Sequence, residues 1–194
     1  MRLLNYLNDI DTRLLLIING AHSAFADKIM ILLSDRLCWI PFYILIVAII
    51  AINYKWKSWL ILLCIALLIT ASDQLTSGFM KPFFERLRPC HTENLLSLLH
   101  LPAGCGGQYG FASSHAANSF CVATFLWLLL HRRYKGIVVL FAWAFMICYS
   151  RIYLAAHYPG DVLVGMLIGL GLGFLFFKVY TLTDKKISQP IKAG

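Results

Sequence analysis

Long apolar runs separated by short polar connections dominate the chain from residue 38 onward. A helix that crosses the hydrocarbon core of a membrane needs about 20 consecutive, mostly apolar residues, and each run approaches that length. The pattern predicts an all-α integral membrane protein with a bundle of five transmembrane helices. We expect these helices at Cys38–Tyr54, Ser58–Met80, Phe111–Leu130, Gly136–Tyr153 and Asp161–Tyr180.

The first 35 residues differ, because apolar side chains recur there at helical spacing and polar side chains occupy the other face. This pattern predicts an amphipathic helix that lies in the membrane interface. A second short helix is expected at Phe25–Leu33, where Asp27 and Lys28 argue against a membrane span. The apolar positions of the first helix are Leu3, Leu4, Leu7, Ile10, Leu14, Ile17 and Ile18, and the polar positions are Asn5, Asn8, Asp9 and Thr12.

The composition supports the membrane assignment. Apolar residues make up 60% of the 194 positions and charged residues 13%, whereas a soluble domain has about 45–50% and about 25%. A soluble core of this size could not hide so much apolar surface, which excludes a typical cytosolic enzyme, a disordered chain and a secreted disulfide-rich module. We expect one membrane-embedded domain over residues 1–194, with interfacial helices in 1–35, an outer loop in 81–110 and a cytoplasmic tail in 183–194.

The net charge of +8 could suggest nucleic-acid binding, but the basic residues are scattered and form no continuous patch. Their distribution predicts the orientation instead, because basic residues in short loops favour the cytoplasm. We place nine of the 17 there: Lys55, Lys57, Arg132, Arg133, Lys135, Lys178, Lys185, Lys186 and Lys192. The small size of the chain favours a bacterial inner membrane with the opposite face toward the periplasm. On that face we expect Arg2, Arg13, Lys28, Arg36, Lys81, Arg86, Arg88 and Arg151.

Ionisable residues in a membrane helix are costly and indicate a function. In this chain they gather at the outer ends of the predicted spans, where three cations, two histidines and a carboxylate would reach one membrane depth. Taken alone, Lys81 or Arg88 is explained better by a side chain that extends to the membrane surface than by a binding site. An ion pair between Arg151 and Asp161 would be purely structural. The group comprises Lys81, Arg88, Ser113, Ser114, His115, Ser150, Arg151, His157 and Asp161.

Together these residue types suit phosphoryl transfer. Lysine and arginine neutralise a phosphate, and unpaired N–H groups of the helix start at Gly110–His115 would point toward the same anion. His157 and Asp161 are four residues apart and are expected on one helix face, so that the carboxylate orients a nucleophilic imidazole. His115 would protonate the leaving oxygen.

The spacing of these residues resembles the three-part signature of the type 2 phosphatidic acid phosphatase superfamily. The first part, K-x6-R-P, begins at Lys81, and the third part, S-R-x5-H-x3-D, begins at Ser150. The second part normally reads P-S-G-H, and here Ala112 and Ser114 replace the proline and the glycine. We expect activity to survive the change at Ser114.

The resemblance implies that His157 is the nucleophile of a phosphohistidine intermediate, Asp161 its orienting partner and His115 the general acid. It implies a phosphate site made of Lys81, Arg88, Ser113, the Ser114 backbone N–H and Arg151, with no metal and no cofactor. The composition agrees with a metal-independent site, because Asp161 is the only acidic residue that we expect near this group and a magnesium site would need a pair of carboxylates.

Two features of the sequence have more than one interpretation. Cys90 and Cys105 lie in the outer loop and would form a disulfide in an oxidising compartment, or a zinc site together with His91 and His100. Asp73 shares a helix face with Ser77 and Lys81, so it either supports Lys81 or packs between helices as a neutral or hydrogen-bonded carboxyl.

The predicted function is a metal-independent phosphatase that hydrolyses a lipid phosphate or pyrophosphate at the outer face of the membrane. A phosphotransferase with the same intermediate and a non-catalytic anion or lipid transporter are the alternatives. The resemblance suggests undecaprenyl diphosphate, phosphatidylglycerophosphate, phosphatidic acid or the 1-phosphate of lipid A as substrate. The sequence selects neither among these nor among oligomeric states.

Overall fold

The computed structural model describes residues 2–188, except for the side chains of residues 3, 4 and 188. Lys192 and the last part of the predicted tail lie outside the described residues. Residues 2–188 form helices and connecting loops, without a β-sheet. The one β-type pairing within these residues is an isolated bridge between Leu87 and Tyr109. The α-helices are α1 (Arg2–Gly20), α2 (Ala24–Ser34), α3 (Ile40–Tyr54), α4 (Ser58–Asp73), α5 (Lys81–Phe84), α6 (Ser114–Leu130), α7 (Val139–Tyr153) and α8 (Pro159–Ser188).

Shorter helical segments join these elements. A π-helix, Gln74–Met80, continues α4 into α5 without a break. The 3-10 segments are Leu37–Trp39, Lys55–Lys57, Pro89–His91, Glu93–Leu98 and Lys135–Val138.

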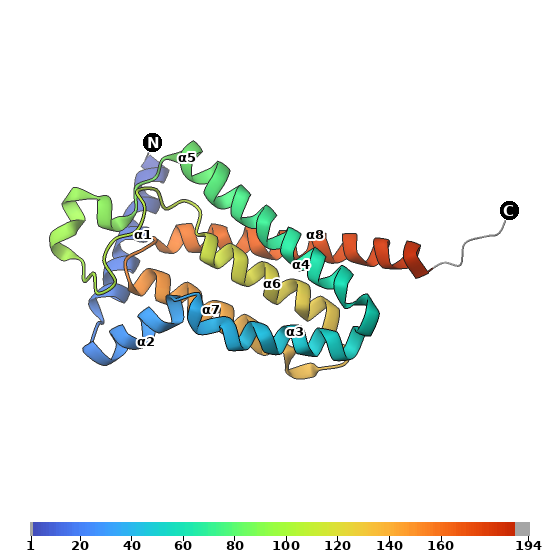
Figure 1. Ribbon diagram of the computed structural model, residues 1–194. Coiled ribbons are helices and arrows are strands. Elements are labelled where there is room, and N and C mark those ends of the chain that lie inside the picture. The colour runs from blue at the N-terminus through green and yellow to red at the C-terminus, as the bar shows by residue number, and fades with distance from the viewer. Residues whose placement is uncertain (1, 189–194) are drawn as a thin grey trace.

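The long helices run back and forth along one axis, so that polar connections collect at the two ends of the bundle (Figure 1). Helix α6 lies in the middle, between α8, α7 and α4. Its core side chains Phe125 and Leu126 are fully buried, as are Ile61 and Leu68 of α4. The apolar core therefore forms around α6, which fixes where the N-terminus of that helix stands.

Helix α8 packs closely against α6 because glycine recurs every fourth residue along its contact face. A Cβ atom on Gly169 would stand 2.5 Å from the Ala117 carbonyl oxygen, and similar clashes would arise at Gly165 and Gly173. Small residues at this spacing let helix backbones approach in membranes. The close approach brings the starts of α6 and α8 together at one end of the bundle.

The fold class is confirmed as an all-α membrane protein. Among residues 2–188, three helical segments are long and apolar enough to cross a membrane: Leu37–Phe84, Lys135–Tyr153 and Pro159–Ile187. A fourth is added if α1 and α2, bent by 117°, count as one span. The first of these reverses direction at Lys55, so that α3 and α4 lie antiparallel (Figure 1). Helix α6 is apolar but has only 17 residues, so the count of five spans stays a prediction.

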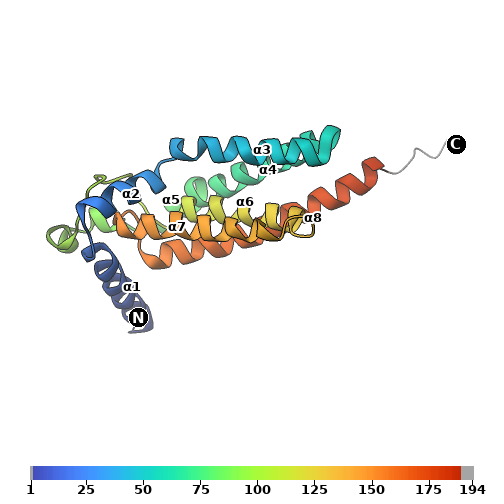
Figure 2. The same cartoon turned by 90° about the horizontal axis from the view of Figure 1, so that it is seen from below.

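Helix α1 crosses the end of the bundle at a steep angle to the other helices (Figure 2). Its predicted apolar stripe, represented by Leu7, Leu14 and Ile17, is exposed, as a membrane-facing stripe would be. A different row faces the protein. In this row Leu15 and Asn19 are fully buried, and the Asn19 amide donates hydrogen bonds to the carbonyl oxygens of His100 and Tyr153.

Candidate active site

Four helix ends and the loop between α5 and α6 meet at the end of the bundle that α1 crosses (Figure 1). Helix α5 ends there, α6 begins, α7 ends at Tyr153 and α8 begins at Pro159. The structure therefore brings the predicted site residues to one place.

The N-terminus of α6 forms the floor of this site. Ser113 is the N-cap residue, and its hydroxyl oxygen is buried without a hydrogen-bond partner among the described residues. The first N–H groups of a helix have no partner within the helix, which leaves those of Ser114 and His115 for a ligand. The expectation of free N–H groups back to Gly110 was wrong, because Gly110 donates to the Arg86 carbonyl at 2.8 Å and Ser113 to the Asp161 carbonyl at 3.0 Å.

Lys81 is held by a row of side chains along the α4–α5 helix. Its Nζ donates to Ser77 Oγ at 3.0 Å, and Ser77 Oγ donates to Asp73 Oδ1 at 3.5 Å. Asp73 is exposed rather than packed between helices. The structure thus favours support of Lys81 by Asp73 over a carboxyl packed between helices.

His157 lies in the short connection before α8, so the expected position on a shared helix face was wrong. It is nevertheless close to Asp161, with 3.6 Å between Nδ1 and Oδ2, and its exposed fraction is 1%. That distance is longer than a hydrogen bond but allows charge attraction. Burial lowers the pKa of the His157 imidazole to about 4, although Asp161 acts in the opposite direction. His157 is therefore neutral at ordinary pH.

Arg86 and Asp11 are two residues of the site that the sequence did not reveal. Arg86 donates from one nitrogen to Asp161 Oδ1 and from the other to Asp11 Oδ2, both at 2.6 Å. Burial alone would lower the pKa of Arg86, but the two carboxylates outweigh it and raise the pKa. Asp161 is thus not the only acidic residue of the site, and its ion-pair partner is not Arg151, as the structural alternative assumed.

The remaining cations face the same region. Arg88 Nε donates to the Tyr109 carbonyl at 3.2 Å, and burial lowers the pKa of its guanidinium. Arg151 donates to Ser34 Oγ, while its Nε has no partner among the described residues. The electrostatic neighbours of His115 include Arg151, His157 and Lys81.

Gly110 is a further site residue that the motif does not include. A Cβ atom there would stand 2.9 Å from Asp161 Oδ2, 3.3 Å from Arg88 Cγ and 3.6 Å from His157 Nδ1. Only glycine allows the loop backbone to approach these side chains so closely.

A cavity of about 280 Å³ opens beside His115 and Ser114. Trp39, Trp143 and Ile69 give it apolar walls. An apolar cavity next to a cluster of cations suits a ligand with an anionic head group and a hydrophobic tail.

Comparison with known proteins decides the family. The sequence model of the PAP2 superfamily matches residues 59–184. A lipid A 4′-phosphatase of Bacteroides thetaiotaomicron is 43% identical over 181 residues, which cover 90% of this chain and 79% of the relative. The chain belongs to the PAP2 superfamily.

Two more similarities agree with this assignment. A lipid A 4′-phosphatase of Porphyromonas gingivalis is 30% identical over 91% of this chain and 75% of its own length. The crystal structure of a PAP2-type phosphatidylglycerolphosphate phosphatase from Bacillus subtilis has the same fold, with a TM-score of 0.71 and 21% identity over 95% of this chain and 89% of that one. The predicted family is confirmed, and the protein is a membrane-embedded phosphatase.

This PAP2 protein has serine where the family motif has glycine, and the structure gives that serine a contact. Ser114 Oγ accepts a hydrogen bond from Lys81 Nζ at 3.0 Å and lies 2.7 Å from Ser77 Oγ and 2.9 Å from Thr76 Oγ1. The extra hydroxyl therefore joins the row that holds Lys81.

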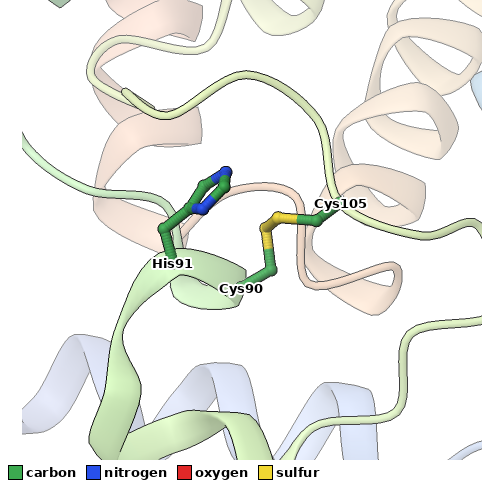
Figure 3. A group of neighbouring side chains, drawn as sticks. All are labelled: Cys90, His91 and Cys105. Atoms are coloured by element: carbon green, nitrogen blue, oxygen red, sulfur yellow. A yellow bond between two sulfur atoms is a disulfide. The ribbon is translucent and has the colours of Figure 1, made fainter.

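The loop between α5 and α6 of this PAP2 protein is closed by a disulfide between Cys90 and Cys105 (Figure 3). His91 lies beside it and contacts the Gly106 carbonyl oxygen at 3.0 Å. The fourth member of the alternative zinc set is elsewhere, since His100 pairs with Asp27 at 2.9 Å. The structure therefore does not assemble that zinc site.

Proposed function

We propose that this protein removes the 4′-phosphate of a lipid A-type glycolipid. The class of enzyme, a lipid phosphatase of the membrane, is common to this chain and its relatives. The choice of substrate rests on the two relatives at 43% and 30% identity, both of which are lipid A 4′-phosphatases. It replaces the 1-phosphate among the substrates that the family resemblance suggested.

The observation that carries the mechanism is the buried pair His157–Asp161 beside polar atoms that have no partner. The negative charge of Asp161, 3.6 Å from His157 Nδ1, favours the tautomer with the proton on Nδ1, which leaves the Nε2 lone pair for attack. Ser113 Oγ and Arg151 Nε, unpartnered among the described residues, are suited to a phosphate oxygen. Lys81 and Arg88 add charge, and the Ser114 N–H adds a donor at the helix start.

The reaction proceeds in two steps. His157 Nε2 bonds to phosphorus while the bond from phosphorus to the sugar oxygen breaks, and that oxygen takes a proton from His115. Water then attacks the phosphohistidine as His115 accepts its proton. The bond between phosphorus and nitrogen breaks, and inorganic phosphate leaves. No metal takes part in either step.

The site faces the periplasm of a bacterial inner membrane in this proposal. The basic connections around Lys55–Lys57 and Arg132–Lys135 lie at the opposite end of the bundle (Figure 1), where the cytoplasm would attract them. The head group of the substrate then reaches the site from the outer leaflet while its acyl chains stay in the bilayer.

The test is phosphate release from lipid A that carries both phosphates, in detergent with a chelator present. Mass spectrometry should show loss of the 4′-phosphate, and His157→Ala should abolish turnover while His131→Ala, a substitution at the far end of α6, should not. Rapid mixing with labelled substrate should trap an acid-labile, base-stable phosphoenzyme. Activity in His157→Ala, or loss of activity with the chelator, would contradict the mechanism.

The same assay separates the alternatives. Label that appears on a second lipid instead of as free phosphate identifies a phosphotransferase. Transport of labelled lipid without hydrolysis, unaffected by His157→Ala, identifies a transporter.

A further inference from the structure

We propose that Arg86 and Asp11 are positioning residues of this phosphatase: Arg86, anchored by Asp11 of helix α1, fixes the Asp161 carboxylate against His157. The inference rests on the proposed function, because it assigns the pair a role in orienting the proposed nucleophile. It makes the N-terminal helix a part of the catalytic machinery.

The two oxygens of Asp161 have separate partners. Oδ1 accepts the 2.6 Å hydrogen bond from Arg86, while Oδ2 accepts one from the Tyr158 N–H at 3.1 Å and faces His157 Nδ1. The side chain of Asp161 is fully buried, and within residues 2–188 Arg86 is the one cation in direct contact with it. A buried carboxylate needs such a partner to stay ionised and in one rotamer.

Arg86 is itself held on three sides. Its second nitrogen donates to Asp11 Oδ2, and its guanidinium lies over the Tyr158 ring with 4.4 Å to the ring centre. Its carbonyl oxygen accepts the Gly110 N–H. The planar guanidinium presents its donors in a fixed fork, so it can join two carboxylates at a set distance as lysine cannot.

Asp11 connects this pair to the start of α8. Its Oδ1 accepts the backbone N–H of Gly160 at 2.7 Å, next to Asp161 in the sequence. A Cβ atom on Gly160 would stand 2.8 Å from Asp11 Oδ2, so glycine permits this close approach. Asp11 also begins the inward row of α1 that continues with Leu15 and Asn19, which are buried. Docking of α1 thereby sets the position of Arg86.

The geometry separates this role from phosphate binding. Both terminal nitrogens of Arg86 are occupied by carboxylates, whereas Arg151 retains a free Nε among the described residues. Loss of Arg86 should therefore disturb the orientation of His157 and lower kcat, while KM stays near that of the wild type. A misplacement of about 1 Å in a catalytic group costs about 10²-fold in rate.

The experiment compares Arg86→Gln, Arg86→Lys, Asp11→Asn and the double variant Asp11→Asn/Arg86→Gln. We expect kcat to fall about 10²-fold in Arg86→Gln and about 10-fold in Asp11→Asn, with KM changed less than about 3-fold. The double variant should be no slower than Arg86→Gln, because both substitutions break one chain of contacts. Arg86→Lys should recover only part of the rate.

Matched controls lie on the same helix. Asp9 and Arg13 are exposed neighbours of Asp11 on α1, and Asp9→Asn and Arg13→Gln should keep wild-type kcat. Size-exclusion profiles and thermal unfolding in detergent identify a variant that fails to fold, and Asp11→Asn then carries the test by itself. Guanidinium ion added to Arg86→Ala should restore activity if the cation is what is missing.

The outcomes distinguish this inference from the proposed function. If His157→Ala is inactive but folded Arg86→Gln and Asp11→Asn keep wild-type kcat, only the positioning role is wrong. A rise in KM at constant kcat in Arg86→Gln would also overturn it, because that result assigns Arg86 to phosphate binding. If His157→Ala remains active, the proposed mechanism itself fails.

Discussion

The two ends of the helix bundle both carry charge, but they use it differently. At the end away from α1, Lys57 and Asp184 form an ion pair at 2.7 Å with 36% and 27% of their side chains exposed. At the other end, Asp161 is fully buried against Arg86, and three polar atoms of Ser113, Arg151 and His157 have no hydrogen-bond partner in the described part of the chain.

The comparison shows that the number of charges does not mark the site. Exposed ion pairs lose little solvation and contribute little to the free energy of unfolding, because water screens their charges. Buried ionic groups are costly unless partners or ligands compensate them, so their presence at one end indicates chemistry. Predictions that set one end against the other test this reading.

The largest difference is expected between Arg151 and Arg132. Arg151→Gln removes a guanidinium that faces the site, and loss of one donor to a transition-state oxyanion typically costs about 10²–10³ in rate. Arg132→Gln, in the connection at the opposite end, should leave kcat unchanged. Steady-state phosphate release measures both, and equal effects of the two substitutions would remove the distinction between the ends.

A glycine pair gives the next largest contrast. In Gly110→Ala the new Cβ would stand 2.9 Å from Asp161 Oδ2, so the carboxylate or the loop must move, and we expect kcat to fall about 10²-fold. Gly136 lies at the other end with no atom within 4 Å of an added Cβ, and Gly136→Ala should be silent. Wild-type kcat in a folded Gly110→Ala variant would contradict the close approach.

The pH profile tests the buried histidine. The pKa of His157 is about 4, whereas an ordinary histidine has about 6.5, so at pH 5.5 His157 is still almost entirely neutral and able to attack. We therefore expect the limb of kcat that reports His157 to lie near pH 4 to 5. A limb that moved up to 6.5 would mean that His157 is solvated rather than buried.

The same shift affects stability with a defined sign. As the pH falls from about 6.5 toward 4, His157 becomes protonated in the unfolded chain but stays neutral in the folded protein. The free energy of unfolding therefore decreases in that window. Thermal unfolding of wild type and His157→Gln should converge there, because glutamine does not titrate.

A smaller effect is expected at Ser114. Ser114→Gly removes the hydroxyl that accepts from Lys81 Nζ, but Ser77 still holds Lys81 at 3.0 Å. We expect kcat within about 10-fold of the wild type, since one net hydrogen bond contributes about 1 kcal/mol. An increase by several orders of magnitude would show that serine distorts the start of α6.

The smallest effect is expected at the exposed end. Lys57→Ala and Asp184→Ala should each lower the free energy of unfolding by no more than about 1 kcal/mol and leave kcat unchanged. Thermal unfolding in detergent measures the change. A loss of activity in either variant would show that the two ends are coupled.

Local patterns of the sequence anticipated much of this architecture. The row Asp73–Ser77–Lys81 could be predicted, because residues four apart share a helix face. The apolar runs likewise indicated each long helix, and the motif spacing named the residues at their ends. These features depend on contacts within one helix or on the length of one helix.

The contacts of Arg86 could not be predicted in this way. It is 75 residues from Asp11 and 75 from Asp161 along the chain, and its place two residues before the motif arginine was the one available hint. The need for glycine at position 110 could not be predicted either, because it depends on which side chains the fold places next to that residue. No local periodicity encodes such distances.

The sequence by itself determined that this protein lies in a membrane, belongs among the PAP2 phosphatases and carries their cations and histidines at helix ends. The length of a hydrophobic run and the spacing of a motif are local properties of the sequence, so they can be recognised without knowledge of the packing. Only the tertiary structure decided which oxygen of Asp161 faces His157 and that α1 supplies Asp11 to the site. It did so because the close packing of α8 on α6 and the docking of α1 join residues that are far apart in the chain.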